Sequence, residues 1–298
     1  MSESQTRLRL FCFGLGYSAT RLARRLVAEG WAVAGTCREE EARRALAAQG
    51  IEAHLFDRGR PLGDPAVLAG TTHLLSSVPP DAAGDAVLDH HGADIAALEG
   101  LRWAGYLSTT GVYGDRGGGR VDEGSALAPT GARSRRRLAA EAAWRALHRE
   151  RGTPVHVFRL AGIYGPGRSV LDQVRSGTAR RIVKPGHAFS RIHVDDIVAV
   201  LRASMARPNP GAVYNVCDDL PAPSAEVVEH ACRLLGVAPP PIEPFESATL
   251  SAISRSFFAD NKRVDNARIK RELGVRLRYP DYRAGLAAIL AEEGREPA

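Results

Sequence analysis

The chain has 298 residues, 44% of them hydrophobic, which is enough to bury the core of one large domain or of two unequal ones. No apolar run approaches the ~18 residues of a membrane-spanning helix, and residues 1–7 lack the apolar segment of a signal peptide, so we expect a cytoplasmic protein. The net charge of +6 comes mainly from arginine interspersed with acids, without an aromatic stacking motif, and we expect no nucleic-acid partner.

The cysteines and histidines show no pattern of a metal site. The chain has four cysteines: Cys12, Cys37, Cys217 and Cys232. None has the paired spacing of metal ligands, and their scatter indicates reduced thiols. The adjacent His90 and His91 fall in a predicted helix without a cysteine or carboxylate cluster, so we expect no metal.

The first predicted elements are a buried strand over residues 8–14 and a helix over 17–29. Between them, Gly14 permits a tight turn and Gly16 allows close approach of the backbone to a pyrophosphate. Ala19 is small enough for the helix to pack on the strand. An anion would bind the N–H groups at the helix start, where the helix dipole favours negative charge. Strand, glycine turn and helix in this order predict a dinucleotide-binding unit.

Strands then alternate with helices. Further strands are expected at residues 31–36, 51–56, 73–77, 106–108 and 155–160. Helices are expected at residues 39–48, 85–98 and 132–149. This alternation predicts an α/β protein with a Rossmann-type, doubly wound parallel sheet covered on both faces.

Beyond residue 167 the pattern is weaker. Short strands are expected near Ile182 and Arg191 and over 213–216, and helices over 195–205, 224–235 and 282–291. We expect a nucleotide-binding domain over residues 1–165, to which 195–218 return. Residues 166–194 and 219–298 would form a smaller substrate or lid domain.

The end of the second strand bears on the choice of cofactor. Folds that bind NAD place an acid there for the ribose hydroxyls, but this chain has Thr36, Cys37 and Arg38. A 2′-phosphate can pair with Arg38 because no carboxylate repels it. We therefore expect NADP, with NAD as the alternative if Arg38 is only a surface residue.

Several later motifs carry a family resemblance. They are STTGVYG at 108–114, RLAGIYGPG at 159–167, RIHVDDI at 191–197, VYNV at 213–216, ELG at 272–274 and YPDYRAG at 279–285. With the glycine turn, they resemble the extended short-chain dehydrogenase/reductases, a superfamily of NAD(P)-dependent epimerase/dehydratase-like enzymes. The resemblance implies a Rossmann fold, a nicotinamide cofactor and a C-terminal substrate domain.

The chain departs from this family at the catalytic pair. Members carry Tyr-x-x-x-Lys on the long helix, where the tyrosine transfers a proton and the lysine lowers its pKa and holds the nicotinamide ribose. Here Arg133 and Arg137 occupy these positions, and arginine is a poor proton shuttle. Arg137 can still bind a ribose or a phosphate. The chain therefore resembles an atypical member of this superfamily.

The resemblance also implies roles for individual residues. Thr109 matches the family's catalytic Ser/Thr and can hold a substrate oxygen. Tyr113 is the nearest phenol, either a catalytic group activated by Arg133 or Arg137 or a packing residue at the strand end. The residues expected to bind the cofactor are Gly14, Gly16, Tyr17, Ala19, Thr36, Arg38, Asp57, Ser77 and Arg137.

Other polar residues have open roles. His193 either faces substrate or holds two loops together, and Asp195 and Asp196 are expected to cap the next helix. The sixth-strand motif reads Ala161-Gly162 instead of the asparagine that meets nucleotide-sugar phosphates in the family, which weakens that substrate class. The remaining anion-contact candidates are Arg168, Arg191, Lys262 and Arg263.

These observations favour an NAD(P)-dependent epimerase/dehydratase-like oxidoreductase acting on a small polar substrate. The alternative is a non-catalytic NADP(H)-binding protein that senses redox state. The long helices at 85–98 and 132–149 could pair two copies, so a homodimer is a further expectation.

Overall fold

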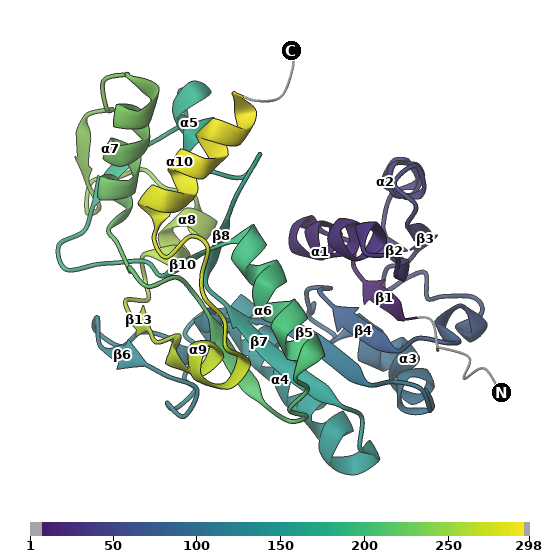
Figure 1. The fold of residues 1–298 in the computed structure, drawn as a ribbon. Coiled ribbons are helices and arrows are strands. Elements are labelled where there is room, and N and C mark those ends of the chain that lie inside the picture. The colour runs from purple at the N-terminus through teal and green to yellow at the C-terminus, as the bar shows by residue number, and fades with distance from the viewer. Residues whose placement is uncertain (1–7, 295–298) are drawn as a thin grey trace. The chain divides into compact units, whose positions relative to one another are not determined.

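The structure is a computed structural model that describes residues 8–294. Residues 1–7, to which the signal-peptide argument applies, and residues 295–298 lie outside the described part. Figure 1 shows an α/β fold built on a seven-stranded parallel sheet, which confirms the expected Rossmann-type class. In chain order its strands are β1 (Arg9–Phe13), β2 (Ala32–Cys37), β3 (Glu52–Leu55), β4 (His73–Ser76), β5 (Trp103–Thr109), β7 (Val155–Leu160) and β11 (Val213–Val216). Their spatial order is β11-β7-β5-β4-β1-β2-β3.

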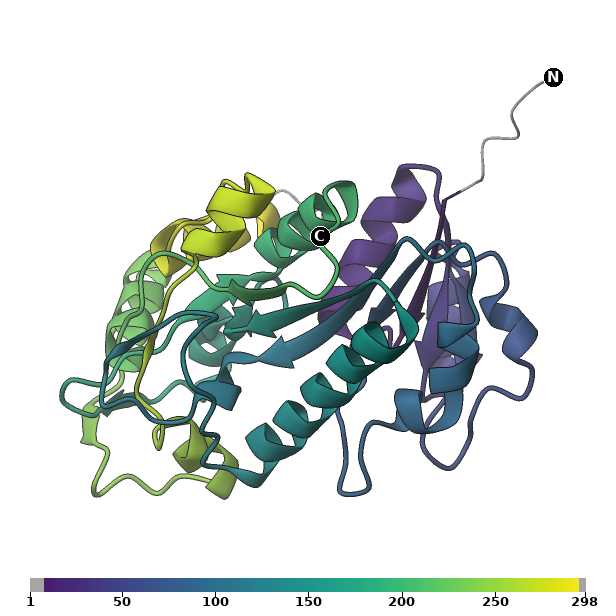
Figure 2. The ribbon, with the colours of Figure 1, turned by 90° about the horizontal axis from the view of Figure 1, so that it is seen from below.

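Helices cover both faces of the sheet. They include α1 (Tyr17–Ala28), α2 (Glu40–Ala47), α3 (Ala86–Ala96), α4 (Ala132–Arg151) and α6 (Val194–Ala206). In Figure 2, α3 and α4 lie on one face and α1, in purple, on the other. On the α3–α4 face, Trp144 packs with Phe13 and Tyr106 in one buried cluster. The central strands β1, β4 and β5 are almost wholly buried, as expected for a parallel sheet covered on both faces, whereas the edge strand β3 is partly exposed.

The described chain forms two compact units. Unit 1 comprises residues 8–108, 136–158 and 201–214, and unit 2 comprises 109–135, 159–200 and 215–294. The expected division differs: of residues 195–218 only 201–214 fall in unit 1, and residues 109–135 and 159–165 also fall in unit 2. These segments follow the carboxyl ends of β5 and β7, where the chain leaves the sheet.

Unit 2 is built from short elements. They are β6 (Arg120–Val121), β8 (Gly162–Tyr164), α5 (Val170–Arg175), β9 (Arg181–Val183), β10 (Arg191–His193), α7 (Ser224–Leu235), β12 (Ile242–Pro244), α8 (Ala252–Phe257), β13 (Arg263–Val264), α9 (Ala267–Leu273) and α10 (Tyr282–Glu293). The strands pair in parallel as β8–β10, β9–β12 and β6–β13. Strands of two or three residues show no period in the sequence, so most of these were not predicted.

Tyr164, Leu171 and Leu286 belong to one core of unit 2. The side chain of Tyr164 packs against Gly285 of α10, and a Cβ atom at Gly285 would lie 2.1 Å from the Tyr164 hydroxyl oxygen. This position therefore requires glycine.

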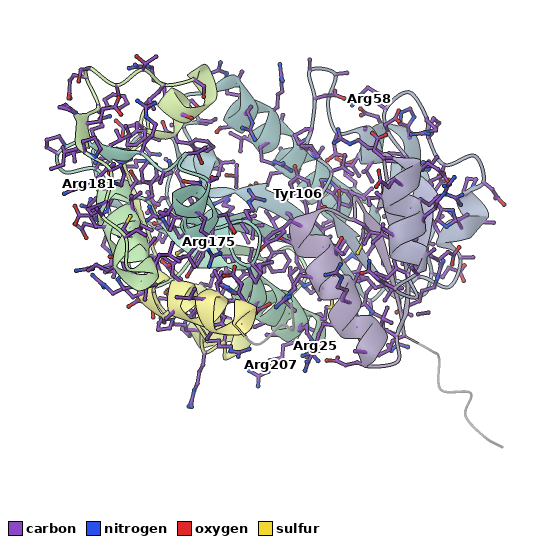
Figure 3. All side chains as sticks on the ribbon, turned by 90° about the horizontal axis from the view of Figure 1, so that it is seen from above. Arg25, Arg58, Tyr106, Arg175, Arg181 and Arg207 are labelled. Carbon is purple, nitrogen blue, oxygen red and sulfur yellow. The ribbon has the colours of Figure 1, made fainter. Side chains whose placement is uncertain are left out.

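Much of the positive charge is paired locally. Figure 3 labels four arginines whose side chains form ion pairs with carboxylates of their own unit: Arg25, Arg58, Arg175 and Arg181. For residues 8–294, no helix has both the length and the apolar character of a membrane span.

Candidate functional site

The glycine turn after β1 is fixed by residues from two neighbouring strands. Gly14 has φ +84°, a conformation that favours glycine. Its N–H donates to Thr36 Oγ1 at 2.8 Å, and its carbonyl accepts from the Ser77 hydroxyl. Three of the residues expected to bind the cofactor thus lie together, and Thr36 and Ser77 hold the turn in shape.

The turn leads directly into α1. Gly16 is the N-cap of α1 and makes no side-chain capping bond. By contrast, Asp85 caps α3 and Asp281 caps α10. A Cβ at Gly16 would meet nothing within 4 Å, so the backbone here borders open space. Ala19, 1% exposed, packs inward as expected. The start of α1 therefore fits the diphosphate of a dinucleotide.

The end of β2 carries an arginine. Arg38 is exposed and follows the half-buried Cys37. Its backbone carbonyl accepts an N–H from Arg60 at 2.8 Å, and the same nitrogen of Arg60 donates to Asp57 at 2.9 Å. Asp57, Arg38 and Thr36, predicted separately, are therefore neighbours around this strand end. Arg60 was not predicted, because only the turn after β3 places it there.

Arg137 lies at the carboxyl ends of β4 and β5. Its Nη1 donates to the carbonyl of Leu107 at 3.0 Å and to the hydroxyl of Tyr106 at 3.2 Å. The guanidinium also lies 5.6 Å from the centre of the Tyr106 ring. These contacts use Nη1 and leave Nε and Nη2 without a partner among the described residues, so Arg137 retains donors for a ligand. Arg133 is exposed.

Unit 2 begins with the segment that carries the candidate catalytic residues. Thr109 ends β5 and is the N-cap of a short 3₁₀ helix, η2 (Thr110–Tyr113), through an N–H···O bond of 3.1 Å from Gly111 to its hydroxyl oxygen. No described residue accepts the hydroxyl hydrogen of the half-buried Thr109. This hydrogen can be donated to a ligand oxygen.

Tyr113, at the other end of η2, is fully buried. Its hydroxyl donates to Asn215 Oδ1 at 2.7 Å and accepts from Arg159 Nη1 at 2.9 Å. Burial raises the pKa of Tyr113, and the Arg159 charge only partly offsets this. Both functions of the hydroxyl are thus used inside unit 2, which favours the packing role that the sequence left open.

Lys262 is a residue that sequence reasoning treated only as one of four anion contacts. Its ammonium donates to the carbonyl of Gly114 at 2.9 Å and lies 3.3 Å from Asp260 Oδ2. Burial lowers the pKa of Lys262, and Asp260 counteracts part of that effect. The tertiary structure thus brings a lysine to the end of the turn that starts at Thr109. No local pattern signals a contact between residues 148 positions apart.

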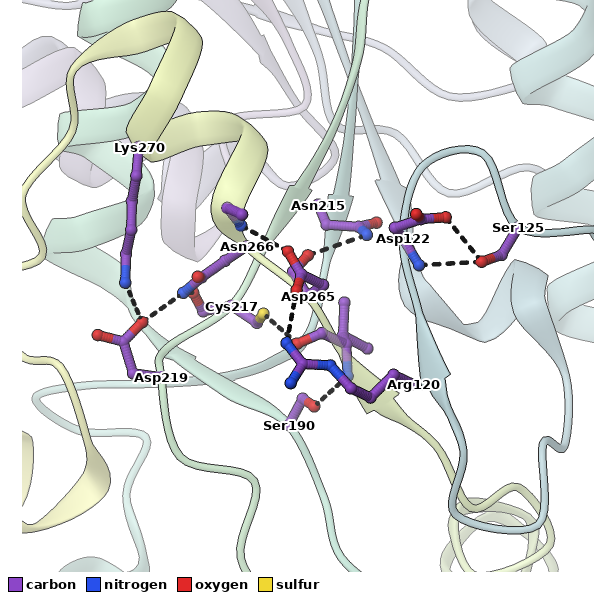
Figure 4. Close-up of polar contacts among 12 residues, drawn as sticks. Arg120, Asp122, Ser125, Ser190, Asn215, Cys217, Asp219, Asp265, Asn266 and Lys270 are labelled. Carbon is purple, nitrogen blue, oxygen red and sulfur yellow. Dashed lines mark hydrogen bonds and ion pairs between the residues drawn. The ribbon is translucent and has the colours of Figure 1, made fainter.

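Residues 265–266, which follow Lys262 closely in the chain, are held by a network of polar contacts, as Figure 4 shows. Arg120 donates to the Asp265 carboxylate at 2.7 Å, and Asn215 Nδ2 donates to the Asp265 carbonyl at 3.1 Å. Asn266 donates to Asp219 at 2.7 Å. The segment is therefore tied both to β6 and to the end of β11.

The remaining candidates have structural contacts. The ring of His193 packs against Tyr164 and Tyr279, and the Asp196 carboxylate accepts the backbone N–H groups of Arg278 and Tyr279. Asp196 therefore holds a distant loop rather than capping its own helix. Arg191 donates to two backbone carbonyls.

Comparison with known proteins agrees with this arrangement. A family model described as the NAD dependent epimerase/dehydratase family matches residues 93–217. The solved structure of a functionally unknown conserved protein from Silicibacter pomeroyi DSS is 52% identical, with a TM-score of 0.89 over 95% of this chain and 98% of that chain. The chain is thus similar to the NAD dependent epimerase/dehydratase family, as the motifs of the sequence indicated.

Two curated relatives extend the comparison. Protein YeeZ from Escherichia coli K12 is 29% identical over 279 residues, or 90% of this chain and 95% of that protein. The 3-diazoavenalumate denitrifying reductase of a Streptomyces species is 32% identical over 143 residues, or 44% of this chain and 45% of that protein. The description of the matched family names NAD as its cofactor.

Proposed function

We propose that this protein is an NADP-dependent oxidoreductase acting on a small polar substrate that carries a carbonyl or hydroxyl group. The observation that supports it most is the glycine turn that leads into α1, with open space at Gly16, beside the exposed Arg38 at the end of β2. The reductase among the relatives favours an enzyme over the redox-sensing alternative.

In this proposal the chain binds the cofactor through unit 1. The N–H groups at the start of α1 hold the diphosphate, Arg38 pairs with the 2′-phosphate, and Arg137 donates its remaining N–H groups to the nicotinamide ribose. The bound nicotinamide supplies or accepts the hydride. Thr109, the last residue of β5, orients a substrate oxygen with its free hydroxyl hydrogen.

The cofactor preference is tested by titrating the protein with NADPH and with NADH and following the fluorescence of the dihydronicotinamide. We expect NADPH to bind more tightly by about ten- to a hundredfold, the value of one charge-assisted contact of ~1.5–3 kcal/mol. Combining Cys37→Asp with Arg38→Ala should reverse the preference. Equal affinities of the unmodified protein for the two cofactors would refute the assignment.

The substrate class is tested by screening small aldehydes, ketones and keto-sugars for slow NADPH oxidation. With a substrate in hand, Thr109→Val should lower turnover by about two- to tenfold, because it removes one hydrogen bond and not the proton carrier. Cofactor affinity should stay the same. Full turnover by this variant would show that Thr109 does not contact the reacting oxygen.

A further inference from the structure

The turn after β3 brings a second arginine to the end of β2. The backbones of Asp57 and Arg60 form a two-way bridge, with N–H···O distances of 3.1 and 3.0 Å. The N–H of Gly59 donates to Asp57 Oδ1 at 2.9 Å, which fixes the turn from inside. The turn therefore has one defined conformation, and it sends successive arginines, Arg58 and Arg60, in different directions.

These two arginines have different partners. The guanidinium of Arg58 forms ion pairs with Asp81 and Asp89. Arg60 instead reaches the carbonyl of Arg38, 22 positions earlier, while the other hydrogen of the same nitrogen is taken by Asp57. Its side chain is still 46% exposed.

Three N–H groups of Arg60 therefore remain available to a ligand. A guanidinium has five N–H groups, and the printed contacts of Arg60 occupy the two on Nη2. The Nε–H and the two Nη1–H groups have no partner within residues 8–294. Arg38, whose own side chain bonds to none of those residues, lies directly beside it. Arg43, by contrast, is paired with both oxygens of Glu40.

The electrostatics of Cys37 show that the charge of Arg60 acts on this strand end. Burial raises the pKa of the Cys37 thiol, the positive charges of Arg43 and Arg60 oppose that rise, and the negative charge of Glu40 adds to it. Arg60 is thus close enough to act electrostatically on the strand end. Two guanidinium groups with free donors suit a dianionic phosphate, since each can form parallel N–H···O bonds with it.

We infer that Arg60 is a second determinant of cofactor specificity, which binds the 2′-phosphate of NADP together with Arg38. The inference rests on the proposed preference for NADP. Its hydrogen bond to the Arg38 carbonyl holds the Arg60 guanidinium at the backbone of Arg38 before the cofactor arrives, which lowers the entropic cost of binding. Discrimination between NADP and NAD is then shared by the loop after β2 and the turn after β3.

The test compares Arg60→Met with a charge-matched control. The control, Arg25→Met, removes a 62% exposed arginine from the last turn of α1, near the start of β2 and not its end. It therefore measures the effect on affinity of losing one positive charge anywhere on unit 1. Both variants and the native protein are titrated with NADPH, NADH, 2′,5′-ADP and ADP. We expect Arg60→Met to weaken NADPH and 2′,5′-ADP by about ten- to a hundredfold, with NADH and ADP unchanged within about twofold. Arg25→Met should leave all four affinities close to native.

Several outcomes would overturn the inference. Equal losses for NADPH and NADH in Arg60→Met would assign Arg60 a purely structural role in the turn. An NADPH preference that survives in Arg60→Met and disappears in Arg38→Ala would leave the proposed function intact and assign the phosphate to Arg38 alone. A native protein without any preference would instead refute the proposed NADP dependence.

Discussion

Replacing Tyr113 by phenylalanine removes one oxygen from the interior of unit 2. That oxygen donates a hydrogen bond of 2.7 Å to Asn215 and accepts one of 2.9 Å from Arg159, whose side chain is 2% exposed. Losing a partner inside a protein costs the remaining polar group ~1–3 kcal/mol, with charged groups at the upper end. We therefore expect Tyr113→Phe to lower the free energy of unfolding by roughly 2–4 kcal/mol.

Urea unfolding followed by circular dichroism measures this loss, and Tyr279→Phe provides a matched control. Tyr279 is 4% exposed and lies in the same unit, but its buried hydroxyl has no hydrogen-bond partner among the described residues. Removing that oxygen should be neutral or stabilising. Native stability in Tyr113→Phe, or an equal loss in both variants, would refute the packing role. If turnover were then lost at unchanged stability, Tyr113 would be the proton carrier.

Two further predictions concern stability. Burial raises the pKa of the Asp218 carboxyl group to about 8, so the folded chain binds the carboxyl proton more tightly than the unfolded chain does. The stabilisation by this proton is complete below about pH 4 and is lost as the pH rises to about 8. Relative to Asp218→Asn, the native protein should therefore lose ~1.4 kcal/mol per pH unit between pH 5 and 7.5, and parallel curves from urea titrations would contradict this. Gly285→Ala should lower the melting temperature by several degrees, because its Cβ would lie 2.1 Å from the Tyr164 hydroxyl oxygen, and Tyr164→Phe should relieve part of the loss; an unchanged melting temperature would show that α10 moves freely.

The amino-acid sequence alone determined most of unit 1. Apolar runs separated by helical periods predicted all seven strands of the sheet, and β7 and β11 match residue for residue. The helix after Gly14 was also predictable, because the glycine turn and the spacing of Leu22, Ala23 and Leu26 are both local signals. The expectation of a nicotinamide cofactor is local in the same way, because the glycine turn and the end of β2 lie within thirty residues of each other.

Only the tertiary structure decided the environment of each side chain. Tyr113 has a catalytic or a packing interpretation in the sequence, and its contacts with Arg159 and Asn215 favour the second. Arg60, which follows β3, donates to the carbonyl of Arg38, which follows the neighbouring strand β2. Lys262 donates to the carbonyl of Gly114, 148 positions earlier in the chain. Such contacts join residues that share no period or motif, and they depend on which strands become neighbours. A sequence pattern records how each element buries its own face, whereas the partners of a polar atom are set by the packing of elements distant in the chain.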